Sequence, residues 1–304
     1  MSGLINIKND CPPIIRQLNE ILGQMREKDP SQFPDFSKAD TVISLSDYAG
    51  DDQAGNYDCL SFFLVDFNNA GVWEIFRREF RKNEKYFIGE MQFKKINQDK
   101  VRQRILSQYL NLFDRINGLS LTFLIHRNVK KLIAESPHVV LEKEGLGKWK
   151  PHIAEKLLRA IHFQMPLVYG LTSQKNMFSW LTDRDAITKD QQKLLEIFQR
   201  ISSIYQTHTF RKFSLAVKFE EKSLGLVIED LMSIPDLVGG AVLEFHNQII
   251  KEAGIVDNVK VQSKSSEILK WLANKKTNLK KHVCIIELKD KLWNMRFLNY
   301  NPKI

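Results

Sequence analysis

Short apolar runs rich in β-branched and aromatic residues recur along this chain, and segments with helical spacing separate them. The clearest runs are TVISLS at 41–46, YDCLSFFLVDF at 57–67, LSLTFLI at 119–125 and MFSWLT at 177–182. Runs of this length and composition, bounded by turn residues, are typical of buried strands. The segments with helical spacing lie at 12–28, 72–82, 101–116, 129–170, 191–205 and 237–250. Strands that alternate with helices in this way predict a mixed α/β sheet flanked by helices.

The order of the strands predicts how the sheet is built. We expect three antiparallel neighbours, at 41–46, 57–67 and 86–93. The runs at 119–125 and 177–182 are expected to extend the sheet on the side of the first strand.

The remaining segments predict how the chain is divided. A sixth strand is expected at 213–219, and residues 283–300 predict a hairpin packed outside the core. We therefore expect an N-terminal helical extension (1–40), an α/β core (41–255) and a C-terminal appendage made of a helix and the hairpin (256–304).

Charge and cysteine content narrow the class of protein. The 304 residues include 45 Lys and Arg against 36 Asp and Glu, a formal net charge of +9. Such a charge favours polyanionic partners such as nucleic acid, although many proteins are basic only for solubility. The scattered cysteines Cys11, Cys59 and Cys284 form neither a disulfide framework nor a zinc ligand set. With no apolar run long enough for a membrane helix and no secretory leader, we expect a cytoplasmic protein without membrane contact.

Four acidic residues lie at informative places in the predicted elements. They are Asp47 directly after the first strand, Glu90 within the third, Asp183 directly after the fifth and Asp236 at the start of a helix. If the strands are neighbours, these carboxylates converge at one edge of the sheet and need cations to stay ionised. Mg²⁺ and Mn²⁺ are hard ions that prefer oxygen ligands. Two such ions about 4 Å apart would hold a phosphate, activate a water molecule and stabilise the leaving oxygen.

Each of these acids also has a purely structural interpretation. Asp47 suits the turn before Gly50, and Asp183 suits a turn or a helix cap. Asp236 follows Pro235, and Asp is among the preferred residues at a helix N-cap. Their spacing in the sequence does not decide between the two interpretations.

Four segments, taken in order, resemble the motifs of one known family. DYAG at 47–50 is similar to a D-E-S-G signature in a first strand, and GEMQFKKI at 89–96 is similar to a G-E-x-K-F-S-K-L segment. WLTDRD at 180–185 resembles a later strand that ends in Asp, and MSIPDLVGGA at 232–241 resembles a closing L-Q-x-A-D-L-x-A-G-A. These motifs belong to a large prokaryotic family of ribonuclease-H-like proteins, most of them uncharacterised predicted nucleases. The resemblance covers roughly residues 40–250.

The resemblance implies a ribonuclease-H-like core and a nuclease that hydrolyses phosphodiester bonds with two Mg²⁺ or Mn²⁺ ions. In that arrangement Asp47 would bridge both ions, and Glu90 and Asp183 would each flank one. Asp236 would complete the second site, with Asp185 as a helper. Families of this kind often occur beside mobile elements and antiphage systems, so the resemblance also implies a role in defence.

Departures from the family pattern keep a second function open. Tyr48 replaces the second acid of the first motif, Ser233 replaces Gln and Pro235 replaces Ala. The alternative is a catalytically silent protein of the same fold. Such a protein would bind nucleic acid or a protein partner, as a homo-oligomer or as a component of a larger assembly.

Basic residues supply candidates for contact with nucleic acid. Lys94 lies in the second motif and could reach the scissile phosphate, although it also fits a plain surface lysine. The helix at 72–82 contains the other candidates, Arg77, Arg78, Arg81 and Lys82. Its aromatic residues recur at helical spacing and are expected in the core, which leaves the basic side chains to contact the nucleic-acid backbone.

Overall fold

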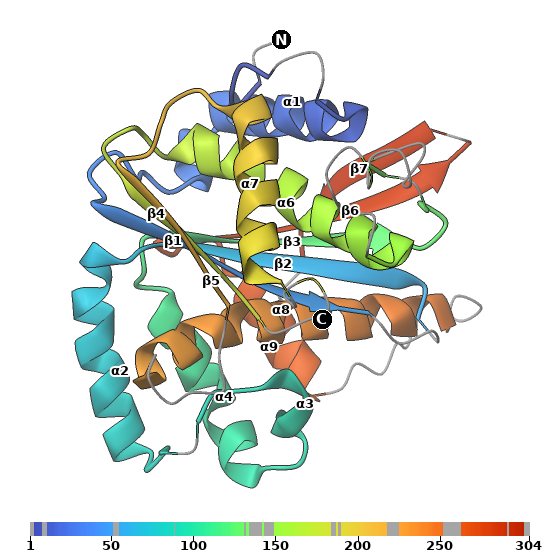
Figure 1. The fold of residues 1–304 in the computed structure, drawn as a ribbon. Coiled ribbons are helices and arrows are strands. Elements are labelled where there is room, and N and C mark those ends of the chain that lie inside the picture. The colour runs from blue at the N-terminus through green and yellow to red at the C-terminus, as the bar shows by residue number, and fades with distance from the viewer. Residues whose placement is uncertain are drawn as a thin grey trace. The chain divides into compact units, whose positions relative to one another are not determined.

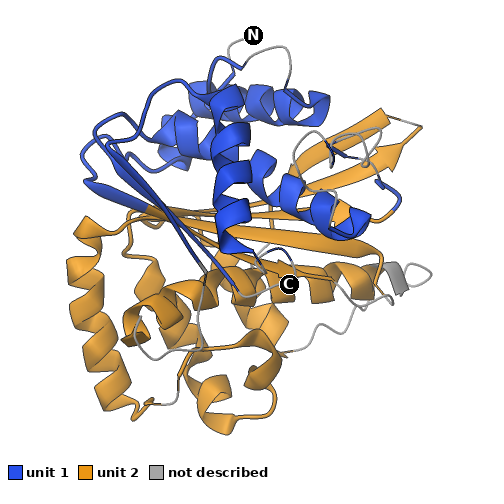
Figure 2. Ribbon diagram, viewed as in Figure 1, with its two compact units in different colours: residues 1–42, 128–219 blue, residues 43–127, 220–304 orange. Residues whose placement is uncertain are grey.

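The chain divides into two units in the computed structural model, and Figure 2 colours them separately. Unit 1 comprises residues 1–42 and 128–219, and unit 2 comprises residues 43–127 and 220–304. The structure describes residues 3–7, 11–50, 55–87, 89–130, 132–133, 142, 149–183, 187, 190–217, 225–251, 263–290 and 292–300. Within these ranges seven strands form a mixed sheet in the order β5-β4-β1-β2-β3-β6-β7. The predicted mixed α/β sheet flanked by helices is confirmed, and it is consistent with a ribonuclease-H-like fold.

Unit 1 combines long helices with a pair of parallel strands (Figure 1). Its elements are α1 (Pro13–Lys28), a short 3-10 helix (Pro30–Gln32), α6 (Pro151–Leu171), β4 (Met177–Thr182), α7 (Gln191–Tyr205) and β5 (Lys212–Val217). Proline begins both α1 and α6, because a missing N–H at the first position removes no helical hydrogen bond. Met177 pairs with Lys212 at the start of the two parallel strands. Most residues of α6 are buried, so this apolar helix forms the centre of the unit.

Unit 2 contains four whole strands of the sheet and most of a fifth, with helices packed on them. Its strands are β2 (Tyr57–Asp66), β3 (Gly118–His126), β6 (Leu279–Lys289) and β7 (Leu292–Leu298), and β1 (Thr41–Ala49) enters it from unit 1. β2 and β3 are antiparallel, with Tyr57 opposite His126, whereas β3 and β6 are parallel, with Gly118 opposite Leu279. β6 and β7 form an antiparallel hairpin.

The helices of unit 2 connect and cover these strands. They are a short 3-10 helix (Asn68–Ala70), α2 (Gly71–Asn83), α3 (Phe93–Ile96), α4 (Lys100–Phe113), α8 (Gly225–Lys251) and α9 (Ser263–Ala273). α8 packs against β2 and β3, and α9 packs against α8 and α4. In Figure 1 these helices lie on one side of the strands of their own unit.

The strand predicted at 86–93 is wrong. The described residues before Phe93, 86–87 and 89–92, form neither helix nor strand, and Phe93 begins α3. The physical reason is that side chains take the place of a neighbouring strand. Arg81 donates from Nη1 to the Tyr86 carbonyl at 3.0 Å and from Nη2 to the Gly89 carbonyl at 2.9 Å. Arginine donors thus satisfy backbone acceptors that a sheet would otherwise satisfy.

Three other expectations about position need correction. The strand at 119–125 is β3 and pairs with β2, rather than lying on the side of the first strand. Asp236 lies inside α8, because this helix begins at Gly225 and continues through Pro235. The hairpin at 283–300 is present as β6 and β7, but β6 pairs with β3 and so belongs to the sheet. The three-part division of the chain predicted from the sequence stays a prediction.

Candidate functional site

Asp47 lies near the end of β1, and its partly buried side chain is close to β2. The strand continues past Asp47 and ends before Gly50, whose φ of +107° is a left-handed conformation that glycine adopts without steric cost. Burial raises the pKa of the Cys59 thiol in β2, and the negative charge of Asp47 raises it further. The Asp47 carboxylate is therefore near Cys59.

Asp236 projects from α8 to the segment that contains Glu90. Its Oδ2 accepts a hydrogen bond of 2.7 Å from the backbone N–H of Phe93. One turn further along α8, Gly240 lies so close to the Phe93 ring that a β-carbon at position 240 would overlap it. The helix is therefore attached to this segment by a polar contact and by a close apolar contact.

Cys59 connects the positions of Asp47 and Asp236. A β-carbon placed on Gly239 of α8 would lie 3.5 Å from the Cys59 sulfur, and Gly239 lies one turn after Asp236. Asp47 lies in β1, the neighbour of β2, and its negative charge acts on the same thiol. Glu90 and Asp236 thus belong to two segments of unit 2 that are in contact, and Asp47 lies in the strand next to β2, on which α8 packs.

The carboxylates do not form a complete metal site as they stand. Carboxylate oxygen is the ligand type that Mg²⁺ and Mn²⁺ prefer. Among the residues that the structure describes, however, no three His, Cys, Asp or Glu side chains are grouped so that they could hold a metal ion.

The fourth predicted acid is Asp183, and Asp185 was predicted as its helper. Asp183 directly follows β4 in unit 1, as predicted, and is partly buried. Asp185 falls outside the described residues.

Arg77 and Arg81 are not surface residues, so their predicted contact with nucleic acid is corrected. They are 5% and 4% exposed, and both bind Asp230, a fully buried residue of α8. Asp230 Oδ2 accepts from Arg77 Nη1 and from Arg81 Nε, each at 2.8 Å. Its Oδ1 accepts from Arg81 Nη2 and, at 2.9 Å, from the Tyr109 hydroxyl. A buried carboxylate is stable here because two guanidinium groups neutralise it.

Asp230 was missed by the sequence analysis, although a signal for it exists. Trp73, Arg77 and Arg81 recur every four residues on α2 and so share one helix face. A face that buries a tryptophan also buries the arginines beside it, and buried arginines need an acidic partner. The sequence does not show which acid this partner is.

The remaining basic candidates lie on the surface. Lys82 and Lys94 are exposed. The Arg78 side chain is 74% exposed and forms an ion pair of 2.5 Å with Glu74, one turn earlier in α2. These three residues stay candidates for contact with phosphate.

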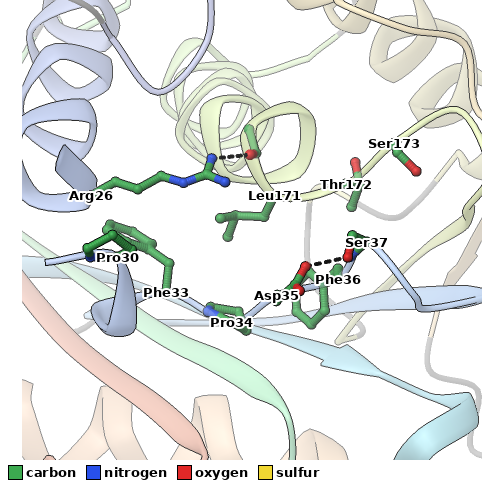
Figure 3. A pocket seen from close by; sticks show the side chains of 11 residues that line it. Arg26, Pro30, Phe33, Pro34, Asp35, Phe36, Ser37, Leu171, Thr172 and Ser173 are labelled. Atoms are coloured by element: carbon green, nitrogen blue, oxygen red, sulfur yellow. Dashed lines mark hydrogen bonds between the residues drawn. The ribbon is translucent and has the colours of Figure 1, made fainter.

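A cavity of about 260 Å³ in unit 1 is lined by none of the predicted site residues, and Figure 3 shows the side chains that line it. Arg26 from α1 reaches across it and donates to the Gly170 carbonyl at 2.9 Å, near the end of α6. Phe33, Phe36 and Leu171 supply apolar lining. Arg26 therefore supplies a hydrogen-bond donor to the last turn of α6, where carbonyl groups lack partners within the helix.

No protein-family model matches the chain, and the comparison with curated proteins found no match. The ribonuclease-H-like resemblance therefore rests on the four motifs. In the described ranges, no helix has both the length and the apolar character that crossing a bilayer requires.

Proposed function

We propose that this protein is a nuclease that hydrolyses phosphodiester bonds of nucleic acid beside β2, where the segments of Asp47, Glu90 and Asp236 meet. The supporting observation is the hydrogen bond from Phe93 to Asp236. This bond joins the motif at 89–96 to the motif at 232–241, about 140 residues later in the sequence. Gly239, in the second motif, lies against the Cys59 thiol, on which the charge of Asp47 acts. Separate motifs that meet at one place are expected for a site with a shared chemical task.

Charge supports nucleic acid as the substrate. The chain has a formal net charge of +9, so its field attracts polyanions. Lys94 is exposed directly after Phe93, whose N–H binds Asp236. Lys94 can therefore contact a phosphate beside the three acids.

We propose that cleavage requires a divalent cation, and this requirement is tested by the assay described below. The resemblance implies Mg²⁺ or Mn²⁺, and the carboxylates are suitable in type, but the grouping of ligands is absent from the described residues. What the chain itself provides is negative charge at Asp47 and Asp236 and a fixed segment around Glu90. A role in defence against phage or mobile elements, in the cytoplasm, belongs to the same proposal.

The test is a cleavage assay on single-stranded DNA, single-stranded RNA, DNA duplex and RNA–DNA hybrid. We expect cleavage with Mg²⁺ or Mn²⁺ that EDTA abolishes and that Glu90→Gln reduces by about a hundredfold or more. Asp35→Asn is the matched control, because Asp35 is an exposed acid of unit 1 and should not affect cleavage.

The second candidate is a nucleic-acid-binding protein without cleavage, alone or with a protein partner. The observation that favours it is that Asp236 already accepts the Phe93 N–H, which is a structural use of this carboxylate. Binding of nucleic acid without cleavage of any substrate in either metal would support this candidate and exclude the nuclease.

A further inference from the structure

Phe87 presents an aromatic ring to solvent three residues before Glu90. The residue is 67% exposed, whereas its neighbour Tyr86 is 1% exposed. Among the described residues, the other large apolar side chains with comparable exposure are aliphatic. An exposed ring beside a candidate site can bury its face against a ligand, which removes apolar surface from water.

The backbone on both sides of Phe87 is held in place from inside the protein. Arg81 binds the carbonyls of Tyr86 and Gly89, and Asp230 holds the Arg81 guanidinium. The Arg81 guanidinium also lies 4.8 Å from the centre of the Tyr86 ring. Because the Tyr86 and Gly89 carbonyls are held before any ligand arrives, a ligand that contacts Phe87 has less backbone to order on binding.

Lys85 occupies a position that favours glycine. The Lys85 N–H donates to the Lys82 carbonyl at 3.2 Å, and the Tyr86 N–H donates to the Arg81 carbonyl at 2.9 Å. These two bonds form the Schellman motif that ends α2, with Lys85 in the left-handed conformation at φ +52°. A lysine there is less stable than a glycine. Its cationic side chain, two residues before Phe87, gives a reason for lysine at this position.

Exposed lysines precede and follow Phe87 in the sequence. Lys82 and Lys85 precede Phe87, Lys94 and Lys95 follow Glu90, and all four are exposed. An aromatic ring between cations matches a strand of nucleic acid, whose bases stack on rings while its phosphates bind lysines. A protein partner that covered the Phe87 ring would also have to neutralise the positive charges of the four lysines.

We propose that Phe87 is a stacking platform for a base of single-stranded nucleic acid, whose phosphates contact Lys82, Lys85 and Lys94. The proposal deepens the nuclease function and rests on it for the direction in which the strand runs, toward Glu90. It selects single strands because the faces of bases within a duplex are already stacked on one another.

Binding is measured by fluorescence anisotropy in EDTA, with labelled single-stranded DNA, single-stranded RNA and a DNA duplex of equal length. Phe87→Ala should weaken single-strand binding about tenfold and leave duplex binding unchanged, whereas Phe87→Trp should retain it. Ile75→Ala is the matched control, because Ile75 is 59% exposed on α2 and should not affect binding. The relative affinity for DNA and RNA shows which of the two strands is preferred.

Lys85→Gly separates the binding role from the structural one. Because glycine relieves the left-handed strain, the melting temperature should rise by about 2 °C. Loss of one phosphate contact should nevertheless weaken single-strand binding and lower the slope of log Kd against log salt by about 0.7. A variant that is more stable but binds more weakly cannot be explained by partial unfolding.

The proposal is overturned if wild type does not bind single strands, or if Phe87→Ala binds them as tightly as wild type. It is also overturned if Phe87→Ala and Ile75→Ala lose the same affinity for single strands, or if Phe87→Ala loses as much affinity for duplex. These results would indicate a protein-binding surface or non-specific attraction by charge. Failure of the nuclease proposal looks different. In that case binding would depend on Phe87, but no strand would be cleaved with Mg²⁺ or Mn²⁺.

Discussion

The Oδ2 atom of Asp236 accepts a hydrogen bond of 2.7 Å from the backbone N–H of Phe93. Phe93 is the first residue of α3, so its N–H has no acceptor within the helix. The bond therefore gives Asp236 a structural task in addition to the negative charge that the proposed function uses. Two substitutions at this position distinguish the tasks.

Asp236→Asn retains a carbonyl acceptor for the Phe93 N–H but removes the charge. We expect its free energy of unfolding to stay within about 0.5 kcal/mol of wild type, while Asp236→Ala loses about 1–2 kcal/mol. Urea denaturation measures both values, and cleavage should be lost in both variants. If Asn and Ala destabilise the protein equally, the hydrogen bond is not the structural contribution of Asp236.

Gly240 and Gly239 are adjacent in α8 but differ in what surrounds them. Gly240→Ala should lower the free energy of unfolding by about 1–3 kcal/mol, because the new methyl group overlaps the Phe93 ring. Gly239→Ala is the control: its nearest neighbours would lie at 3.4 and 3.5 Å, and alanine favours the helix by up to about 1 kcal/mol. Thermal unfolding of both variants checks the pair, and a stable Gly240→Ala protein would contradict the close contact described for Phe93.

Asp230→Ala should be the most destabilising of these substitutions. It leaves the buried Arg81 guanidinium without this counter-charge and leaves Arg77 with Glu74 alone, and breaking a buried ion pair in this way costs about 3–5 kcal/mol. Arg78→Ala removes an ion pair whose arginine side chain is 74% exposed and should cost less than about 1 kcal/mol. Chemical denaturation compares the two variants. Similar losses would mean that the buried charges contribute no more than the exposed pair.

The buried histidine His162 predicts how stability depends on pH. Its Nδ1 contacts the Tyr205 hydroxyl, which also accepts a hydrogen bond of 3.1 Å from Cys11. Burial lowers the pKa of His162 from 6.5 to about 3. Between these values the unfolded chain binds a proton that the folded chain does not, so this group makes stability fall as the pH drops below about 6.5. The expected slope is up to about 1.4 kcal/mol per pH unit.

His162→Asn removes this titration and retains a polar atom near the position of Nδ1. Urea denaturation between pH 7 and pH 5 should therefore show a weaker pH dependence for the variant than for wild type. Identical pH dependence in the two proteins would show that His162 does not contribute to it.

The sequence was most informative where apolar runs decide the local structure. The runs at 57–67, 119–125 and 177–182 are strands, and the tail forms the predicted hairpin. The neighbours of a strand were harder to predict, because pairing depends on contacts distant in sequence. β3 pairs with β2 on one side and with β6, from the end of the chain, on the other.

The errors have identifiable physical causes. Residues 86–93 contain the aromatic and apolar residues of a strand, but Arg81 binds the carbonyls of Tyr86 and Gly89, and the apolar pattern does not show that a nearby arginine side chain takes these acceptors. Pro235 suggested a helix start, whereas α8 includes it in its interior. Arg77 was interpreted as a surface cation because its partner, Asp230, lies 153 residues away. The predicted ligand set itself stays a prediction.

The most direct test of the account is the response of Asp47→Asn to Mn²⁺. Asparagine has nearly the shape of aspartate, so the fold should persist, and the metal-free variant should be at least as stable because one anion is removed. Melting temperatures with and without Mn²⁺, and cleavage of single-stranded and duplex substrates, are measured for both proteins. We expect Mn²⁺ to raise the melting temperature of wild type only, and cleavage by the variant to fall by about a hundredfold or more. Equal Mn²⁺ shifts and equal cleavage rates in the two proteins would contradict it.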